Sequence, residues 1–300
     1  MGRKIILDTD IGNDIDDSWA LGLILASPEL DLKLVVSAVG DTAKNGAMIA
    51  KFLEMTGRTD VPLGFGVSQP GVAHSMDTWV EDYDISAYPG TVYEDGVQAI
   101  VDTVMASDEP VTILAIAPVT NIAAALEREP RIAEKCEIIA IAGSIYNGHS
   151  LDEIQKGSDY NIRADIPAFR RVLQAPWKIT LAPLDISAHL VIGDDHYQHL
   201  LQDRSSKPII DAIMDSFHCW MVAHNALYYK THSTALYDLA AVYIAIKGEY
   251  NLIFEDHKLT VDDGGYTNDD ENGKLCRCAV YWKYVDMFYK FVTDRFRGLK

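Results

Sequence analysis

Short apolar runs that alternate with helical segments are the feature of this chain that most restricts its fold. The runs at 32–39 (LKLVVSAV) and 111–117 (VTILAIA) are mostly apolar, which is typical of parallel strands that are covered on both faces. Similar runs occur at 4–9, 137–142 and 177–183, and helical segments separate them. The pattern predicts an α/β fold with a mostly parallel central sheet, an open Rossmann-like sheet with helices on both faces and right-handed crossovers.

The second half of the chain has a different pattern. Residues 207–229, 234–247 and 284–297 have the periodicity of helices, whereas 258–282 places a turn-rich stretch, DDGGYTNDDENG, between two strand-like pieces. We therefore expect a hairpin within a helical C-terminal cap. The chain has no linker-like stretch and no internal repeat, and a chain of this length can bury about three-quarters of its surface. Residues 1–300 are predicted to form a single domain.

The charge of the chain excludes several classes of partner. Acidic residues number 44 and basic residues 26, which gives a net charge of −18. Such a field repels phosphate backbones and anionic lipids, so we expect neither a nucleic-acid nor a membrane partner. The N-terminal MGRKIILDTD lacks the features of a signal peptide, and the four cysteines lack the usual zinc spacing. A cytoplasmic protein with reduced thiols is the prediction.

Five aspartates lie within ten residues, between the first predicted strand and the first predicted helix: Asp8, Asp10, Asp14, Asp16 and Asp17. Two unit charges ~4 Å apart repel by roughly 4 kcal/mol at an effective dielectric of 20, so the cluster needs a compensating charge. The N-terminus of the helix stabilises Asp16 and Asp17 in part. Asp8 and Asp10 reach that end less directly, and a hard divalent cation is the natural partner for them.

Three other interpretations of aspartates at this place are compared with the metal site. Helix capping combined with a solvated acidic loop is the simplest. An EF-hand loop is excluded, because the twelfth position from Asp8 is Trp19 rather than Glu. Phosphotransferases of the haloacid dehalogenase type also carry DxD after their first strand, and Asp8 would then be the nucleophile. Their usual Thr or Val two residues after the second Asp is replaced here by Gly12.

Several segments resemble the inosine-uridine nucleoside hydrolase family, in the order that the family has them. DTDIGNDIDDSWAL resembles the family's DTDxG motif followed by an Asp-Asp pair that opens a helix. Further resemblances are carried by LAIAPVTNIAAAL at 114–126, SDYNIRADIPAFRRVL at 158–173 and TALYDLAAVYI at 234–244. Together they extend over roughly residues 3–250. Each segment alone is moderately specific, and their common order makes the resemblance strong.

The resemblance implies a Ca²⁺-dependent hydrolase that cleaves the N-glycosidic bond of ribonucleosides. Free base and ribose would be released through a metal-activated water and an oxocarbenium-like transition state. The implied metal ligands are Asp10, Asp17, the carbonyl of Thr120, and Asp238. Two extra residues precede the Asp-Asp pair, so Asp14 remains an alternative to Asp17. Members of the family are usually homodimers or homotetramers, and the resemblance implies the same here.

The same resemblance assigns roles to further residues. Asp10 is expected to accept the proton of the attacking water. Asp16 and Asn161 would hold ribose hydroxyls, and Asp159, which stands where the family usually has Glu, would assist them. Asp41 stands where many members have Asn after a Gly, and it is a further candidate for substrate binding.

The residue before the late metal-binding Asp departs from the well-known family members, which have a His there that is associated with protonating the leaving base. This chain has Tyr237, and a neutral phenol is a much weaker acid than an imidazolium. Tyr237 would act by stacking and hydrogen bonding, or another group would protonate the base: His74, Tyr228 or Tyr229. His74, in an irregular loop, and Tyr228 are also candidates for binding the base of the substrate. The departure leaves two alternatives open, an N-ribohydrolase of an unusual ribosyl compound and a non-catalytic protein that binds ribose or a nucleoside.

Overall fold

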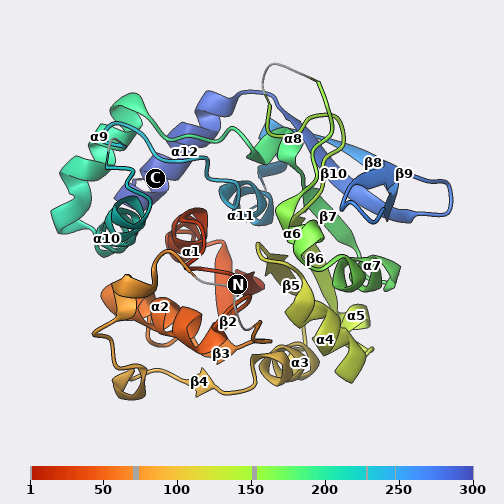
Figure 1. Cartoon of the computed structure of the whole chain (residues 1–300), viewed down its shortest axis with the longest axis horizontal. Helices are drawn as coiled ribbons and strands as arrows, with labels where there is room; N and C mark the ends of the chain where they lie inside the picture. The colour runs from red at the N-terminus through yellow and green to blue at the C-terminus, as the bar shows by residue number, and fades with distance from the viewer. Residues whose placement is uncertain (1, 70–73, 151–153, 228, 247, 300) are drawn as a thin grey trace.

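A ten-stranded sheet forms the centre of the molecule (Figure 1), in the strand order β4-β3-β2-β1-β5-β6-β7-β10-β8-β9. The structure is a computed structural model that describes residues 2–69, 74–150, 154–227, 229–246 and 248–299. In this order, neighbouring strands from β4 through to β10 are parallel to each other. β8 runs antiparallel to both of its neighbours, β10 and β9. Their bounds are β1 Arg3–Thr9, β2 Leu30–Ser37, β3 Leu63–Phe65, β4 Val92–Tyr93, β5 Val111–Ala115, β6 Cys136–Ile141, β7 Ile179–Ala182, β8 Leu252–Val261, β9 Thr267–Asp269 and β10 Lys274–Trp282.

Helices cover both faces of the sheet, as the sequence predicts. Along β1, Ile5 and Leu7 pack into one hydrophobic core and Ile6 packs into the other, because successive side chains of a strand point to opposite faces. The first core lies under α1 (Asp16–Leu25), α2 (Thr42–Met55), α10 (Pro208–Ala223), α11 (Leu239–Ala245) and α12 (Val285–Arg297). The second lies under α3 (Gly96–Ala106), α4 (Thr120–Arg128), α5 (Ile132–Lys135) and α7 (Ile166–Gln174).

The C-terminal region differs from the expected helical cap, because three of its segments are strands of the main sheet. β10 inserts between β7 and β8, in parallel with β7 and antiparallel to β8. The buried side chains explain this placement: Cys276 and Cys278 pack into one core and Ala279 into the other, so β10 is covered on both faces. An isolated hairpin would leave one of these faces in water. The predicted helix at 284–297 is confirmed as α12, whereas the predicted helix at 207–229 ends at Ala223.

Three further α-helices complete the fold: α6 (Tyr160–Ala164), α8 (Leu184–Ser187), which packs against β7 and β10, and α9 (Asp194–Asp203), which packs against α10 and α12. α11 packs against β5, β6 and β7, which brings its N-cap residue, Asp238, to the ends of these strands. The four cysteines are free thiols. In the described ranges, every helix is too short or too polar to cross a bilayer.

Candidate active site

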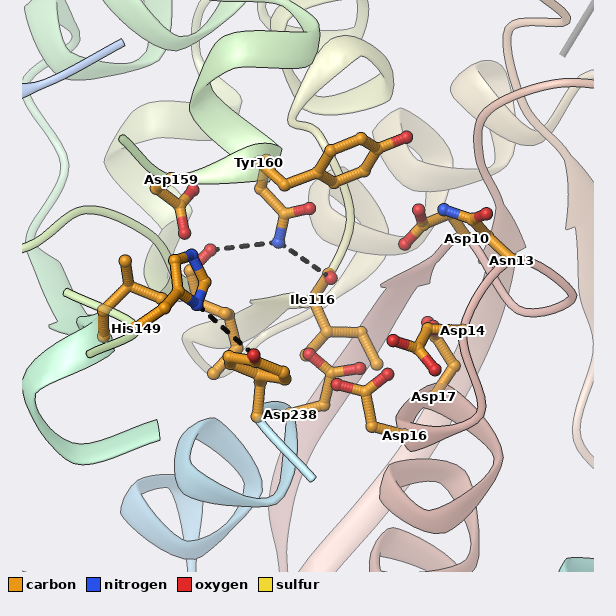
Figure 2. Close-up of a pocket in the computed structure, with 14 residues that line it drawn as sticks. Asp10, Asn13, Asp14, Asp16, Asp17, Ile116, His149, Asp159, Tyr160 and Asp238 are labelled. Atoms are coloured by element: carbon orange, nitrogen blue, oxygen red, sulfur yellow. Dashed lines mark hydrogen bonds between the residues drawn. The ribbon is translucent and has the colours of Figure 1, made fainter. Parts of the chain in front are cut away.

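A cavity of about 280 Å³ opens at the carboxyl ends of β1, β5 and β6 (Figure 2). Ligand sites of open parallel sheets usually occur at this edge. Asp10 follows β1, Ile116 follows β5, and Ile141 is the last residue of β6. The lining consists of Asp10, Asn13, Asp14, Asp16, Asp17, Ile116, Ile141, His149, Asp159, Tyr160, Asn161, Leu184, Tyr237 and Asp238.

Three carboxylates meet at the floor of the cavity. Asp16 and Asp17 open helix α1 and Asp238 caps helix α11, and one carboxylate oxygen from each lies within 4.8 Å of the others. All three side chains are buried, with at most 5% of their surface exposed. The hydroxyl of Thr9, the last residue of β1, donates a hydrogen bond to Asp17 Oδ1. The junction of strand and helix therefore fixes two of the carboxylates, and the second half of the chain supplies the third.

Burial and mutual repulsion raise the pKa values of these three carboxyl groups and of Asp10, which lines the same cavity but does not belong to the group of oxygens within 4.8 Å. Burial is the largest cause for Asp10, whose pKa rises to about 8, and the charge of Asp16 adds to it. Burial and the neighbouring aspartates raise the pKa values of Asp16, Asp17 and Asp238 well above the usual range. The described residues that line the cavity include no lysine or arginine to offset these charges. An oxygen-only donor set of this kind fits a hard divalent cation such as Ca²⁺.

Asp14, the alternative ligand, is placed differently from Asp17. Its side chain is exposed at the rim of the cavity, and its Oδ1 accepts a hydrogen bond from the backbone N–H of Ile15 at 2.8 Å. It does not belong to the group of oxygens within 4.8 Å. Helix α1 begins at Asp16, so the two extra residues lengthen the preceding turn and leave the Asp-Asp pair at the helix start.

Asp159 and Asn161 line the wall beside the carboxylates, as the resemblance implies. Asp159 caps α6 by accepting the N–H of Ile162 at 3.0 Å, and burial raises its pKa to about 7. Asn161 Nδ2 donates to the carbonyls of Ile116 at 3.0 Å and Ile141 at 3.2 Å, as the dashed lines in Figure 2 show. These bonds use the amide N–H groups of Asn161 and leave its Oδ1 as an acceptor for a ligand.

Three residues that the sequence analysis proposed for the site lie outside the cavity lining. Asp41 is exposed and caps α2, where it accepts the N–H of Lys44 at 3.1 Å. His74 is buried against Gly40, and burial lowers its pKa. The hydroxyl of Thr120 donates to Asp165 at 2.7 Å, at the start of α4. The strand-end residues Ile116 and Ile141 line the cavity instead, and the carbonyls of both accept the amide of Asn161.

Tyr228 and Tyr229 are two further residues that the sequence analysis proposed as proton donors to the leaving base. Tyr228 lies outside the described residues. Tyr229 packs with Phe217 and Trp220, at ring-centroid distances of 6.3 and 6.2 Å, and is therefore part of an aromatic cluster of the core. It does not belong to the cavity lining.

Tyr237 lines the cavity as expected, and it contacts a residue that sequence reasoning missed. Its hydroxyl oxygen lies 3.3 Å from Nδ1 of His149, and the two rings meet edge to face at a centroid distance of 5.8 Å. His149 belongs to the irregular segment that follows β6. Its position after a parallel strand was the feature of the sequence that could have indicated a place in the site. Tyr160, also missed, directly follows Asp159 in the segment that carries the resemblance and is 41% exposed.

Asp8 is separate from the cavity, which overturns the phosphotransferase alternative. Its side chain is fully buried and accepts a hydrogen bond from Asn121 Nδ2 at 2.8 Å, and burial raises its pKa to about 7. A nucleophile must be reachable by its substrate and must be ionised. Asp8 does not meet the first requirement, because it is fully buried and outside the cavity lining.

A comparison with family models decides which family the chain represents. The model described as inosine-uridine preferring nucleoside hydrolase matches residues 5–289, almost the whole length. The chain belongs to this family. This nucleoside hydrolase is therefore an enzyme of a hydrolase family, which removes the alternative of a non-catalytic binding protein.

Two relatives show how similar this nucleoside hydrolase is to named proteins. The pyrimidine-specific ribonucleoside hydrolase RihA of Enterobacter sp. (strain 638) is 29% identical over 264 residues, which cover 83% of this chain and 80% of that protein. The non-specific ribonucleoside hydrolase RihC of Klebsiella pneumoniae subsp. pneumoniae is 31% identical over 210 residues, 65% of this chain and 66% of that protein. The first name specifies pyrimidines, and the second specifies no base.

Solved structures with the same fold include a plant nucleoside hydrolase, PpNRh1, with a TM-score of 0.81 and 20% identity over 99% of both chains. A purine-preferring ribonucleoside hydrolase from Gardnerella vaginalis has a TM-score of 0.79 and 20% identity over 99% of both chains. At this level of identity, the likeness shows that the α/β fold of the nucleoside hydrolase is shared.

Proposed function

We propose that this nucleoside hydrolase cleaves ribonucleosides to free base and ribose in a Ca²⁺-dependent reaction. The observation that carries the proposal is the group of buried oxygens from Asp16, Asp17 and Asp238 within 4.8 Å, in a cavity without a basic side chain among its described lining residues. Asn161, with a free amide oxygen, lies on the adjoining wall. A cation and a polyhydroxylated sugar together satisfy these acceptors.

The proposed ligands of the cation are Asp10, Asp17, Asp238 and one backbone carbonyl. The resemblance suggested the carbonyl of Thr120, whereas the position of Ile116 at the cavity favours the carbonyl of Ile116. When it is bound, Ca²⁺ supplies a Lewis acid that acidifies water and orients the sugar hydroxyls. The raised pKa values of the cluster support this assignment, because a dication would return the carboxyl groups to their ionised form.

The remaining residues of the site are proposed to bind the sugar and to move one proton. Asp16 and the amide oxygen of Asn161 accept hydrogen bonds from ribose hydroxyls, with Asp159 assisting. Asp10 accepts the proton of the attacking water. As the C1′–N bond lengthens, positive charge develops on the sugar, as in glycoside hydrolysis. Preorganised carboxylates around it stabilise that charge more than they stabilise the substrate.

A hydrolase of an unusual ribosyl compound is the second candidate, and Tyr237 is the observation that favours it, because the well-known family members have a His there. We also propose that residues 1–300 act as one domain, that the protein forms a homodimer or homotetramer, and that it is cytoplasmic. The net charge of −18 supports an enzyme that acts on small molecules rather than on nucleic acid or membranes.

The test measures ribose release from a panel of purine and pyrimidine ribonucleosides, with added Ca²⁺ and with a chelator. Release that the chelator abolishes and Ca²⁺ restores is the expected result. Release that Mg²⁺ restores as well as Ca²⁺ does would contradict the choice of metal. If Ca²⁺ binds and no nucleoside of the panel is cleaved, the proposed substrate class is wrong and the second candidate takes its place.

A further inference from the structure

Cleavage of a nucleoside requires a proton donor for the leaving base. When the C1′–N bond breaks, its electron pair stays on the base, and most bases leave poorly as anions. A group at the cavity must therefore donate a proton to the leaving nitrogen, which typically contributes 10²- to 10⁴-fold to the rate. The cavity floor consists of carboxylates that a cation would keep ionised, so the donor has to come from another part of the lining.

Tyr237 and His149 are joined at the cavity by a polar contact and a ring contact. The hydroxyl oxygen of Tyr237 lies 3.3 Å from Nδ1 of His149, the contact that is dashed in Figure 2. Both side chains line the cavity. In Figure 2, His149 lies on the side of the cavity away from Asn13 and Asp14.

Both partners of this pair are held in place by the fold. The carbonyl of Tyr237 accepts the N–H of Ala240 at 3.1 Å, at the start of α11. The segment before His149 is held by Asp185, whose carboxylate accepts the N–H groups of residues 145, 146 and 147 at 2.8, 2.7 and 2.9 Å. A fixed contact between a phenol and an imidazole can pass a proton, because each group is both a donor and an acceptor.

We propose that Tyr237 and His149 form the pair that protonates the leaving base, with Tyr237 as the catalytic residue and His149 as the positioning residue that acts through it. This inference rests on the proposed function and deepens it. The phenol alone is a weak acid. With the imidazole behind it, the phenol can donate its proton and be reprotonated within the same step, so that a phenolate does not have to form.

The proton balance of the step is closed. His149 starts the step as the imidazolium. The C1′–N bond breaks and the base nitrogen takes the hydroxyl proton of Tyr237, while Tyr237 takes the Nδ1 proton of His149, which becomes neutral. Water adds its oxygen to C1′ and gives one proton to Asp10. Solvent then carries that proton to His149, which is exposed at the cavity mouth. The enzyme returns to its initial state, and the sum is nucleoside plus water to ribose plus base.

The environment of His149 sets its acidity. Partial burial lowers its pKa, and His189 and Arg163 add to this effect, so the imidazolium gives up a proton more readily than that of a free histidine, while a smaller fraction of the enzyme carries it at neutral pH. Tyr160 is the rival donor, because it also lines the cavity. The side chain of Tyr160 is hydrogen-bonded to that of Asn13, and an amide is not an acid that could reprotonate the phenol.

The test compares two kinds of leaving group on the Ca²⁺-loaded enzyme. Inosine and uridine need a proton on the base, whereas p-nitrophenyl riboside leaves as a stable nitrophenolate. For Tyr237→Phe and His149→Ala, kcat on the nucleosides is expected to fall at least ~10²-fold, the scale of general-acid loss. The kcat on p-nitrophenyl riboside is expected to change less than about threefold on the same reasoning. The double variant should be no slower than the slower single variant, because both residues act in one step.

Three further measurements make the outcomes distinguishable. Added imidazole is expected to restore nucleoside cleavage by His149→Ala, which a merely structural role of His149 would not allow. Tyr93→Phe, an exposed residue on β4, is the control for a lost tyrosine hydroxyl and should retain the full rate. Tyr160→Phe should not show a loss that is confined to the nucleosides.

Each other result overturns a defined part of the proposal. Equal losses on both kinds of substrate, or no losses, remove the pair from the proton transfer. A selective loss in Tyr160→Phe instead assigns the donor to Tyr160 and overturns the pair. A wild-type enzyme that cleaves none of the three substrates overturns the proposed function itself, and the pair falls with it.

Discussion

Asn161 connects two strand ends and the cavity through a single amide. Its Nδ2 donates to the carbonyls of Ile116 and Ile141, and its Oδ1 remains for the sugar. In Asn161→Asp, both carbonyls lose their donor and face an anion instead. Leaving buried acceptors without a partner typically costs ~1–3 kcal/mol.

We therefore expect Asn161→Asp to lower the free energy of unfolding by about 1–3 kcal/mol, on that same scale, and to raise KM for ribonucleosides. Denaturant unfolding and steady-state kinetics measure the two effects. Asn272→Asp makes the same chemical change at an exposed turn, and it serves as the matched control. A stable Asn161→Asp variant with unchanged KM would show that the amide neither supports the strands nor binds the sugar.

Asp10 is the residue to which we assign the proton of the attacking water. Asp10→Asn keeps the size of the side chain and removes the base, so kcat should fall at least ~10²-fold at saturating Ca²⁺. Ca²⁺ affinity, measured separately by calorimetry, shows whether the metal is still bound under these conditions. Asp108→Asn, on the exposed surface, should retain the wild-type rate. Near-normal turnover by Asp10→Asn would remove Asp10 from this role.

At the residue scale, the sequence predicts side chains better than it predicts backbone and loop contributions. The structure brings Asp16, Asp17 and Asp238 together because they lie at helix starts on one edge of the sheet. A carbonyl ligand could not be singled out, because every residue offers a carbonyl and only the local backbone decides which carbonyls lie near the cavity. His149 was missed for a related reason, since its place depends on how an irregular segment folds back.

The segment after β6 shows how one element holds a site that carries little secondary structure of its own. Asp185, on α8, accepts three consecutive backbone N–H groups of this segment, and Thr267 of β9 exchanges hydrogen bonds with Ser144. A carboxylate accepts these bonds better than an amide, because it carries charge and offers two acceptor oxygens.

Asp185→Asn should therefore loosen the segment that carries His149. We expect a loss of about 1.5–3 kcal/mol in the free energy of unfolding, the range for hydrogen bonds to a charged group. The kcat on ribonucleosides should fall more than the kcat on p-nitrophenyl riboside. Asp84→Asn, an exposed aspartate that caps a turn in the same way, is the control. Equal kinetics of Asp185→Asn and wild type would mean that the segment holds His149 without Asp185.

At the element scale, the parallel half of the fold could be predicted because each buried strand is a nearly continuous apolar run. The place of β10 could not, because apolar residues at 275–280 suit either a hairpin that covers the sheet or a strand within it. The long-range pairing of Arg277 with Thr180 and of Cys278 with Leu181 decides between the two. Such pairing depends on the free edge of β7, which local sequence does not describe.

For the molecule as a whole, the carboxylate cluster links stability to pH and to the metal. Asp10, Asp8 and Asp159 have pKa values of about 8, 7 and 7 in the folded protein, against an ordinary value of 3.8. Between the ordinary pKa of 3.8 and the raised pKa values of the folded protein, the folded state therefore holds more protons than the unfolded state. The stability that these groups contribute is present at low pH and is lost as pH rises through about 7–8.

We expect the melting temperature of the chelated protein to fall between pH 5 and pH 8, and the gain on adding Ca²⁺ to grow over the same range. At a Ca²⁺ concentration of one hundred times Kd, the gain at pH 8 should be about 2.7 kcal/mol. Thermal unfolding with Ca²⁺ and with a chelator, at each pH, measures both trends. A chelated protein that becomes more stable from pH 5 to pH 8 would contradict this account of the cluster.

The insertion of β10 between β7 and β8 also has a consequence for how the protein is made. Chains generally begin to fold from the N-terminus during synthesis, so β1 to β7 can pair while the rest is still being translated. β7 then keeps an open edge until Lys274–Trp282 emerges from the ribosome. Open edges of this kind pair readily with other chains. Translation that stops shortly before Lys274 should therefore yield a product that aggregates. The last tenth of the chain determines whether the rest of the polypeptide remains soluble.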